Sequence, residues 1–182
     1  MTANRSELGR LSVSGSPRNI GQALGEAGRE AVHTVLIHHP AWQALTAPRH
    51  GPAVARMGAQ VRALLPRIWE ELAGLADGLD LPLEQVLAWN CRGDLLAATG
   101  DGCTTVQIPG PEPVIGHNED GLPGLRGHAF IATIQPDDGP GFQSFCYPGS
   151  IPGHTFARTD TGLVQTVNNL RLQGVHPTLP RM

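Results

Sequence analysis

The sequence has 182 residues, a mass of 19.3 kDa and a formal charge of −3 at pH 7, from 13 basic and 16 acidic side chains. This length suits a single domain or a piece of one, and a composition of 40% hydrophobic and 16% charged residues excludes a chain kept disordered by its charge. The mild acidity argues against nucleic acid as a partner, and no apolar run approaches the roughly 20 residues that span a bilayer, so no membrane partner is expected.

The first half of the chain is predicted to be helical, after a polar and extended lead-in over residues 1–17. Apolar residues recur at steps of three and four over residues 19–37 and again over residues 53–74, which indicates two amphipathic helices. Pro66 lies inside the second pattern and predicts a kink or two shorter helices at that point. Residues 82–90 predict a third helix, with proline in its first turn.

The second half is predicted to be a sheet. Runs of β-branched and aromatic residues between Gly- and Pro-rich turns predict strands at residues 103–108, 114–118, 129–134, 142–147 and 163–167. Helices followed by a mainly antiparallel sheet define an α+β fold. Such a sheet needs cover on both faces, and nothing after Val167 could cover the second, so we expect the chain to be the N-terminal part of a longer one.

Cys103 is the main candidate for a catalytic residue. It follows Gly100-Asp101-Gly102, and Gly102 leaves the carbonyl before the thiol sterically open to attack. Attack of the thiol on this carbonyl would form a thioester. The peptide bond before Cys103 would then be cut, and Cys103 would become a new N-terminus. Its free α-amine, with a pKa of roughly 7.7–8.0, could serve as a general base to its own side chain. The alternative is a buried cysteine that caps a strand, the commoner role of a lone cysteine.

Polar side chains gather at the end of the next predicted strand, in Gly116-His117-Asn118-Glu119-Asp120-Gly121. A hairpin with the Cys103 strand would bring Asn118 and Asp120 beside the thiol. Because alternate residues of a strand share a face, we expect Glu119 to point away. The alternative is an ordinary turn, since Asn, Asp and Gly are common turn residues.

Two amides, Asn168 and Asn169, follow the strand predicted at residues 163–167. A side-chain amide can donate a hydrogen bond to a developing oxyanion, so either residue could serve in catalysis. The sequence leaves open which of the two does so.

Other side chains predict no further site. Cys91 and Cys146 suit core positions, and no metal site is expected. His38 and His39 end a helix, where imidazolium favours the helix dipole. The remaining histidines considered show no spacing typical of metal ligands; they are His33, His50, His128, His154 and His176.

The residue types also limit which reactions and which cellular compartment can be expected. All 13 basic residues are arginine, which excludes Schiff-base chemistry and the lysine of a phosphate-binding loop. The N-terminus lacks the apolar segment of a secretion signal, and three widely spaced cysteines fit free thiols better than disulfides. We therefore expect a cytoplasmic protein.

Taken in order, these motifs resemble the acyl-coenzyme A:6-aminopenicillanate acyltransferase family of N-terminal nucleophile (Ntn) hydrolases, which also contains hydrolases of β-alanyl amines. The resemblance rests on Gly102-Cys103-Thr104-Thr105, on residues 116–120 and on the strand at residues 162–170. Upstream, residues 70–78 and 87–94 look like the helical prosegment of the family. The similarity spans most of residues 15–175.

The resemblance implies an αββα sandwich and self-cleavage between Gly102 and Cys103. Residues 1–102 would form an α fragment that stays bound to a β fragment, residues 103–182, within one domain. Asp120 matches the acidic partner that orients the amine of the nucleophile, Asn118 has a supporting role, and Asn168 or Asn169 matches an oxyanion-binding or substrate-orienting amide. The family's catalytic arginine lies in sequence that follows these motifs in relatives and has no match here.

The predicted function is that of an enzyme that hydrolyses or transfers the acyl group of a small N-acyl amide or acyl thioester through a Cys103 acyl-enzyme. No cofactor is expected, although acyl-coenzyme A could be a substrate. The expected partners are the small-molecule substrate and the two cleavage fragments, and assembly into a homo-oligomer stays open. One alternative is a binding or scaffold domain that keeps the fold without activity. The last-ranked alternative is a papain-like cysteine hydrolase, which needs a histidine partner, and none of the eight histidines occurs in a recognisable downstream context.

Overall fold

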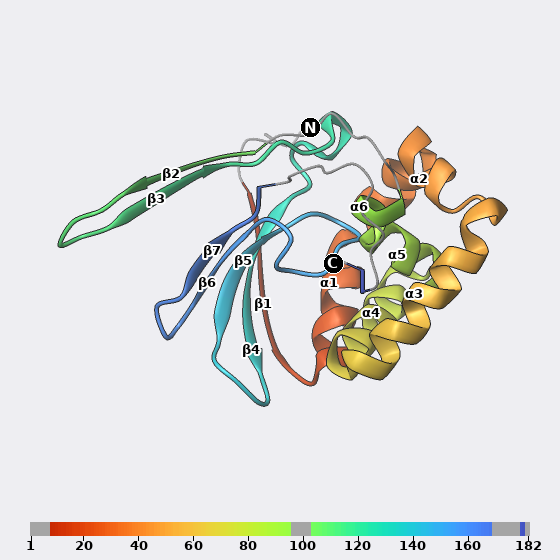
Figure 1. Ribbon diagram of the computed structural model, residues 1–182, viewed down its shortest axis with the longest axis horizontal. Coiled ribbons are helices and arrows are strands. Elements are labelled where there is room, and N and C mark those ends of the chain that lie inside the picture. Colours follow the sequence, from red (N-terminus) through yellow and green to blue (C-terminus); the bar gives the residue numbers. More distant parts are fainter. Residues whose placement is uncertain (1–7, 96–102, 169–178, 181–182) are drawn as a thin grey trace, which may run out of the picture.

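In the computed structural model, helices pack on one side of a five-stranded sheet and a two-stranded hairpin extends on the other side (Figure 1). The structure describes residues 8–95, 103–168 and 179–180. The predicted α+β class is confirmed. One strand precedes the helices, however, so the order is not simply helices and then sheet.

The five-stranded sheet has the order β1-β4-β5-β6-β7. Strands β1 and β4 pair in parallel, and the remaining neighbours are antiparallel, as predicted for most of the sheet. Two strands, β1 and β6, were not predicted, because each has few apolar residues and the lead-in was expected only to be extended. The strands span Gly9–Gly15 (β1), Phe130–Pro136 (β4), Phe142–Cys146 (β5), Phe156–Thr159 (β6) and Val164–Thr166 (β7).

Prolines set several of the helix boundaries. Pro66 has no backbone N–H to donate, so one helix ends at Leu64 and the next begins at Pro66, which confirms two shorter helices there. Pro40, which follows the apolar pattern of residues 19–37, opens a short helix. The helices span Pro17–Thr34 (α1), Pro40–Leu45 (α2), Gly51–Leu64 (α3), Pro66–Leu79 (α4), Leu83–Asn90 (α5) and Arg92–Leu95 (α6).

Helices α1 and α4 cross in direct backbone contact. Gly21 and Gly25 of α1 face Gly74 and Gly78 of α4, and a Cβ atom at any of the four would overlap a main-chain carbonyl of the other helix. Backbones this close allow Cα–H groups to approach carbonyl oxygens, a weak but recurrent contact between helices. The helical layer therefore depends on glycine at these positions.

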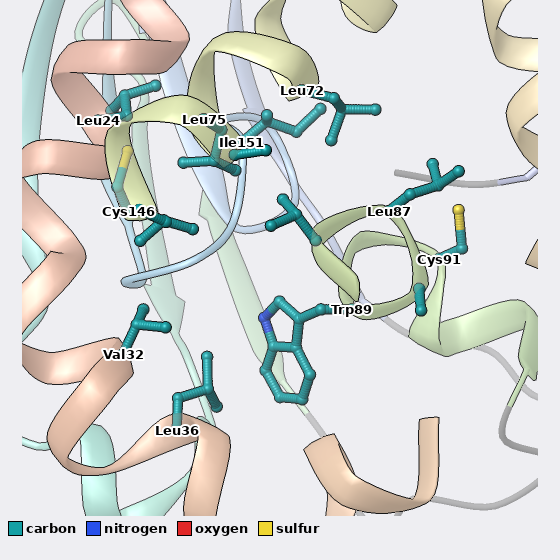
Figure 2. Close-up of a cluster of buried hydrophobic side chains, with 14 of the residues drawn as sticks. Leu24, Val32, Leu36, Leu72, Leu75, Leu87, Trp89, Cys91, Cys146 and Ile151 are labelled. Atoms are coloured by element: carbon teal, nitrogen blue, oxygen red, sulfur yellow. The ribbon is translucent and has the colours of Figure 1, made fainter. Parts of the chain in front are cut away.

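The helices and one face of the sheet enclose a single hydrophobic cluster (Figure 2). Alternate residues of β4, namely Phe130, Ala132 and Ile134, point into it and are at most 6% exposed. Cys91 and Cys146 are buried in the same cluster, which confirms their predicted core positions.

A buried amide fixes the loop between β5 and β6 onto α5. Asn90 Nδ2 donates to the carbonyl oxygens of Val86 (2.8 Å) and Gly149 (3.1 Å), and its Oδ1 accepts from the Ile151 N–H (3.0 Å). Every one of these polar groups is thus paired away from water, which makes the amide a specific connection between the helices and the sheet.

Strands β2 (Thr104–Ile108) and β3 (Val114–Asn118) pair as an antiparallel hairpin, as predicted, but they form a sheet of their own, separate from the five-stranded sheet. Near its base, the His117 ring lies 5.9 Å from the Phe156 ring of β6, which stacks on Phe145 of β5. Its outer part is exposed to solvent. The described residues thus supply one helical layer, one sheet and a hairpin on the sheet's other face, and the complete αββα sandwich stays a prediction.

A pocket of about 320 Å³ lies between the helices α1 and α4 and the strands β4 to β7. Its walls are mostly apolar, and Glu71 of α4 is among them. Burial raises the pKa of the Glu71 carboxyl group to about 7, and the nearby Arg67 guanidinium opposes this rise only in part.

The free energy of unfolding should fall as the pH rises from about 4.5 to about 7. In that window the unfolded chain has lost the Glu71 proton, because its pKa has the ordinary value near 4.5, while the folded protein still holds it. The contribution amounts to at most about 3 kcal/mol. Urea denaturation across this range should show the decline, and Glu71→Gln should remove it. Glu30→Gln, which changes an exposed acid of α1, should leave the decline unchanged. Equal dependence of the free energy of unfolding on pH in Glu71→Gln and in the parent would contradict the assignment.

Within the described ranges, no helix combines the length and apolar character that a bilayer span requires.

Candidate active site

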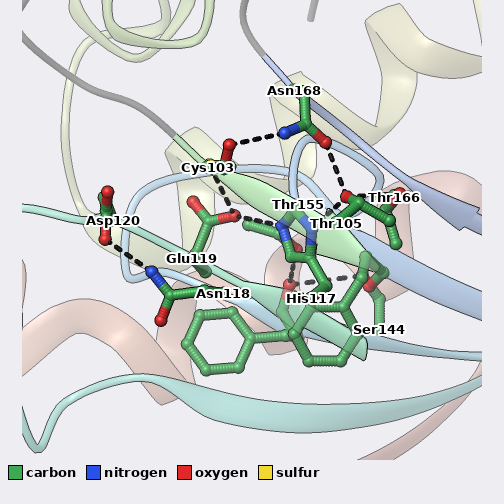
Figure 3. Close-up of polar contacts among 12 residues, drawn as sticks. Cys103, Thr105, His117, Asn118, Glu119, Asp120, Ser144, Thr155, Thr166 and Asn168 are labelled. Carbon is green, nitrogen blue, oxygen red and sulfur yellow. Dashed lines mark hydrogen bonds and ion pairs between the residues drawn. The ribbon is translucent and has the colours of Figure 1, made fainter. Parts of the chain in front are cut away.

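The candidate site lies at the base of the hairpin, where the start of β2, the end of β3 and the residues after β7 meet (Figure 3). The hairpin register pairs Thr104 with Asn118 and Thr105 with His117. Continued by one residue, it places Cys103 opposite Glu119. Because directly opposed residues of an antiparallel pair point to the same face, Cys103, Thr105, His117 and Glu119 share one face of the hairpin.

The carboxylate of Glu119 is therefore the side chain beside the thiol. Cys103 Sγ lies 3.6 Å from Glu119 Oε2 and is placed to donate to it. The expectation that Glu119 points away was wrong by one step of register. A shift of one residue in the pairing of two strands exchanges the faces to which their side chains point. Glu119 therefore lies beside the thiol, where Asn118 and Asp120 were expected.

Asn118 and Asp120 share the opposite face and bind each other, with Asn118 Nδ2 donating to Asp120 Oδ1 at 2.9 Å. The main-chain N–H of Asp120 nevertheless lies within hydrogen-bonding reach of the Cys103 sulfur. Asp120 thus meets the thiol through its backbone, whereas the side chain of Asn118 is hydrogen-bonded to Asp120.

Asn168 connects the end of β7 to the candidate nucleophile. Its Nδ2 donates to the Cys103 carbonyl oxygen at 2.6 Å, and its Oδ1 accepts from the Thr105 hydroxyl at 2.6 Å. Asn169 lies outside the described residues, and so does Gly102, the residue before the predicted cleavage point.

His117 was not among the predicted site residues, although it is central to this hydrogen-bond network. Thr105 gives its one hydroxyl proton to Asn168, so it can only accept from His117 Nδ1, which is 2.9 Å away. The tautomer with a proton on Nδ1 follows, and Nε2 faces Glu119 Oε2 at 3.1 Å. The His117 and Glu119 side chains are 4% and 14% exposed.

A signal in the sequence could have found these residues. The loop at residues 109–113 is centred on Pro111, and counting outwards from it pairs Cys103 with Glu119 and Thr105 with His117. Thus the length of the Pro-rich loop sets which polar residues meet the thiol.

The environment of Cys103 keeps its thiol protonated at neutral pH. Burial is the largest cause that raises the pKa of this thiol, and the Glu119 and Asp120 carboxylates raise it further, whereas the Asp120 main-chain N–H lowers it. Cys91 and Cys146 are buried in the core, and burial raises their pKa values to about 12. Of the three thiols, Cys103 is thus the one that reagents and substrates can reach.

Glu119→Gln should make Cys103 of the uncut chain more reactive. The substitution removes a negative charge and the acceptor that stabilises the protonated thiol, so the pKa should fall and the alkylation rate at neutral pH should rise. The measurement is the rate of iodoacetamide labelling of the Cys103 peptide as a function of pH. Glu112→Gln, at an exposed residue between β2 and β3, carries the same charge change and should leave the profile unmoved. A midpoint that stays or rises in Glu119→Gln would contradict this account.

The candidate site is thus built around one accessible thiol, that of Cys103. The comparisons with known proteins agree with the resemblance seen in the sequence. Residues 109–182 match the family described as acyl-coenzyme A:6-aminopenicillanic acid acyl-transferase. The β-alanyl-dopamine/carcinine hydrolase of Drosophila melanogaster is 28% identical over 130 residues, covering 60% of this chain and 34% of that protein. The acyl-coenzyme A:6-aminopenicillanic-acid-acyltransferase 40 kDa form of Emericella nidulans is 25% identical over 178 residues, covering 92% of this chain and 49% of that protein.

The resemblance to this acyltransferase family is thereby confirmed. The chain spans between a third and a half of the length of these two relatives, one of which is named as a hydrolase and the other as an acyltransferase.

Proposed function

We infer that the protein is an enzyme of amide hydrolysis or acyl transfer in which Cys103 is the nucleophile. The observation that carries this proposal is the position of the thiol. Cys103 is the only cysteine that is not buried, and a carboxylate and an amide side chain hold it and its carbonyl group in place. The resemblance to relatives that are an acyltransferase and a hydrolase by name supports the reaction class.

The proposed activation is self-cleavage. Glu119 accepts the thiol proton, Sγ attacks the Gly102 carbonyl carbon, and the bond to the Cys103 nitrogen breaks as that nitrogen takes up a proton. Water then hydrolyses the thioester, which leaves a carboxylate on Gly102 and a free amine on Cys103. The α-amine becomes the base for later turnovers, and Asp120 and Asn118, immediately beside it in the hairpin, are the proposed groups that orient it.

The structure offers a reason why the two fragments would stay together. Strand β1, from residues 1–102, pairs along its whole length with β4, from residues 103–182, and helices of the first fragment pack on that sheet. Separating the fragments would expose both this ladder and the core.

The proposed substrate is a small N-acyl amide or an acyl thioester such as an acyl-coenzyme A, with water or an amine as acceptor and no bound cofactor. The substrate acylates Sγ and releases its amine or thiol; the acceptor then attacks the thioester and restores the thiol. Asn168 or Asn169 is the proposed amide that orients the substrate or stabilises the oxyanion.

Intact-mass analysis of purified protein tests the proposal. It should detect two polypeptides, residues 1–102 and 103–182, and N-terminal sequencing should begin at Cys103. Cys103→Ala should give one uncut chain, and Cys146→Ala, which removes a buried thiol, should still be cut. After acid quenching of a reaction with an acyl thioester, the second polypeptide should carry the mass of the acyl group.

Cleavage of Cys103→Ala at the same bond would overturn the cysteine mechanism. An uncut parent whose Cys103 takes up no acyl group would instead favour a binding or scaffold domain.

A further inference from the structure

Three side chains whose atoms could each ligate a metal ion converge at the base of the hairpin, and they are a thiol, an imidazole and a carboxylate. Cys103 Sγ, His117 Nε2 and Glu119 Oε2 all lie within 4.8 Å of one another (Figure 3). Sulfur and oxygen are 3.6 Å apart, and nitrogen and oxygen are 3.1 Å apart. The sequence spacing did not predict a metal site, because only the hairpin register places a thiol opposite a carboxylate and two residues from a histidine.

Two of the three separations, sulfur to oxygen and nitrogen to oxygen, match the edges of a tetrahedral zinc site. With a Zn–S bond of about 2.3 Å and Zn–N and Zn–O bonds of about 2.0 Å, tetrahedral angles hold sulfur and oxygen about 3.5 Å apart and nitrogen and oxygen about 3.3 Å apart. The third pair, sulfur and nitrogen, lies within 4.8 Å, and rotation of the Cys103 and His117 side chains would bring it to the roughly 3.5 Å of a tetrahedral edge. Thiolate, imidazole and carboxylate are also the set of ligands that zinc commonly takes in proteins.

The surroundings already hold the ligands as a metal site requires. His117 Nδ1 donates to Thr105, which is in turn fixed by Asn168, so Nε2 is the ring nitrogen that can give its lone pair to a metal once it carries no proton toward Glu119. Such partners of a ligating histidine set its tautomer and orientation. The Asp120 carboxylate adds negative charge near the sulfur, and Cys103 is partly open to solvent, which leaves an entry path and an open fourth position.

We propose that Cys103, His117 and Glu119 bind one Zn²⁺ ion, and that the bound ion masks the Cys103 thiol. The thiol loses its proton to solvent on binding, and the sulfur lone pair that would attack a carbonyl carbon is donated to the metal. Inhibition of catalysis by the metal rests on the proposed function, whereas binding itself does not. All three ligands lie within residues 103–119, so the site forms whether or not the chain is cut before Cys103.

Titration of the untagged protein with Zn²⁺ in competition with a chromophoric chelator tests the site. We expect one ion per chain with micromolar or tighter affinity, lost in Cys103→Ala and in His117→Ala. Thr105→Val leaves all three ligands in place and removes the hydroxyl that accepts from His117 and donates to Asn168, so it should weaken binding by about 10–100-fold. His38→Ala, at an exposed histidine, should bind like the parent. With Co²⁺ in place of zinc, a thiolate-to-cobalt absorption band should appear and be absent from Cys103→Ala.

A second readout concerns the thiol. The rate of iodoacetamide labelling at Cys103 should fall in proportion to the fraction of protein that carries zinc and recover when a chelator is added. Absence of one-to-one binding, binding that survives Cys103→Ala, or labelling that is indifferent to bound zinc would each overturn the proposal. Zinc binding by a protein that is neither cut nor acylated would leave this inference standing and remove the proposed function. A protein that is cut and acylated but binds no zinc would overturn this inference and leave the proposed function standing.

Discussion

Gly74→Ala is expected to lower the free energy of unfolding by about 3 kcal/mol or more, the upper part of the range for overpacked sites. The new methyl group would overlap the Arg18 carbonyl of α1, and the neighbouring main chain of that helix leaves it no room. A side chain could rotate away from such an overlap, but a helix backbone must shift as a unit. Shifting α1 would also disturb the Gly21 and Gly78 contacts along the same crossing.

Urea denaturation followed by circular dichroism would measure the loss. If Cys103 cuts the chain as proposed, the Cys103→Ala background keeps every variant a single uncut chain, so that a two-state analysis applies. Gly51→Ala is the matched control, because a Cβ atom there meets no other atom within 4 Å. A loss in Gly74→Ala no larger than in Gly51→Ala would show that the two helices do not pack this closely.

Asn90→Ala should also cost about 3 kcal/mol, because it leaves the Ile151 N–H and the Gly149 carbonyl buried without their partner and opens a small cavity. The loop that Asn90 holds leads into β6, whose Phe156 supports the ring of His117. The loss of stability should therefore be accompanied by looser order at the base of the hairpin.

The same denaturation assay measures this loss, and hydrogen exchange of residues 147–156 reports the loosened loop. Gln43→Ala removes an exposed amide and should change stability by less than about 0.5 kcal/mol. If Asn90→Ala and Gln43→Ala prove equally stable, the buried amide does not join the helices to the sheet as described.

The position of Glu119 changes how the site would work. An interpretation based on strand alternation alone paired the thiol with Asn118 and Asp120, and the register replaces them with Glu119 and His117 in the uncut chain. Glu119 is then the base that lies beside the thiol for the proposed self-cleavage. The roles of Asp120 and Asn118 would begin only once the amine of Cys103 is free.

Much of the fold could be predicted from local sequence patterns. Apolar periodicity located α1, the pair α3 and α4, and α5; Pro66 divided the pair because a residue without an N–H cannot continue a helix. Cys103 stood out for its glycine neighbours, and Cys91 and Cys146 for their apolar surroundings. Each of these features depends on residues a few positions apart, so the sequence contains the necessary information.

Tertiary structure alone decided which distant groups meet. The partner of β1 is β4, more than a hundred residues away, and Asn168 reaches Cys103 because β7 ends beside the hairpin. Periodicity tells which residues of a strand share a face, but the identity of the facing residue depends on register and on the packing of separate elements. The meeting of Cys103, His117 and Glu119, on which the proposed chemistry depends, is therefore a property of the folded chain.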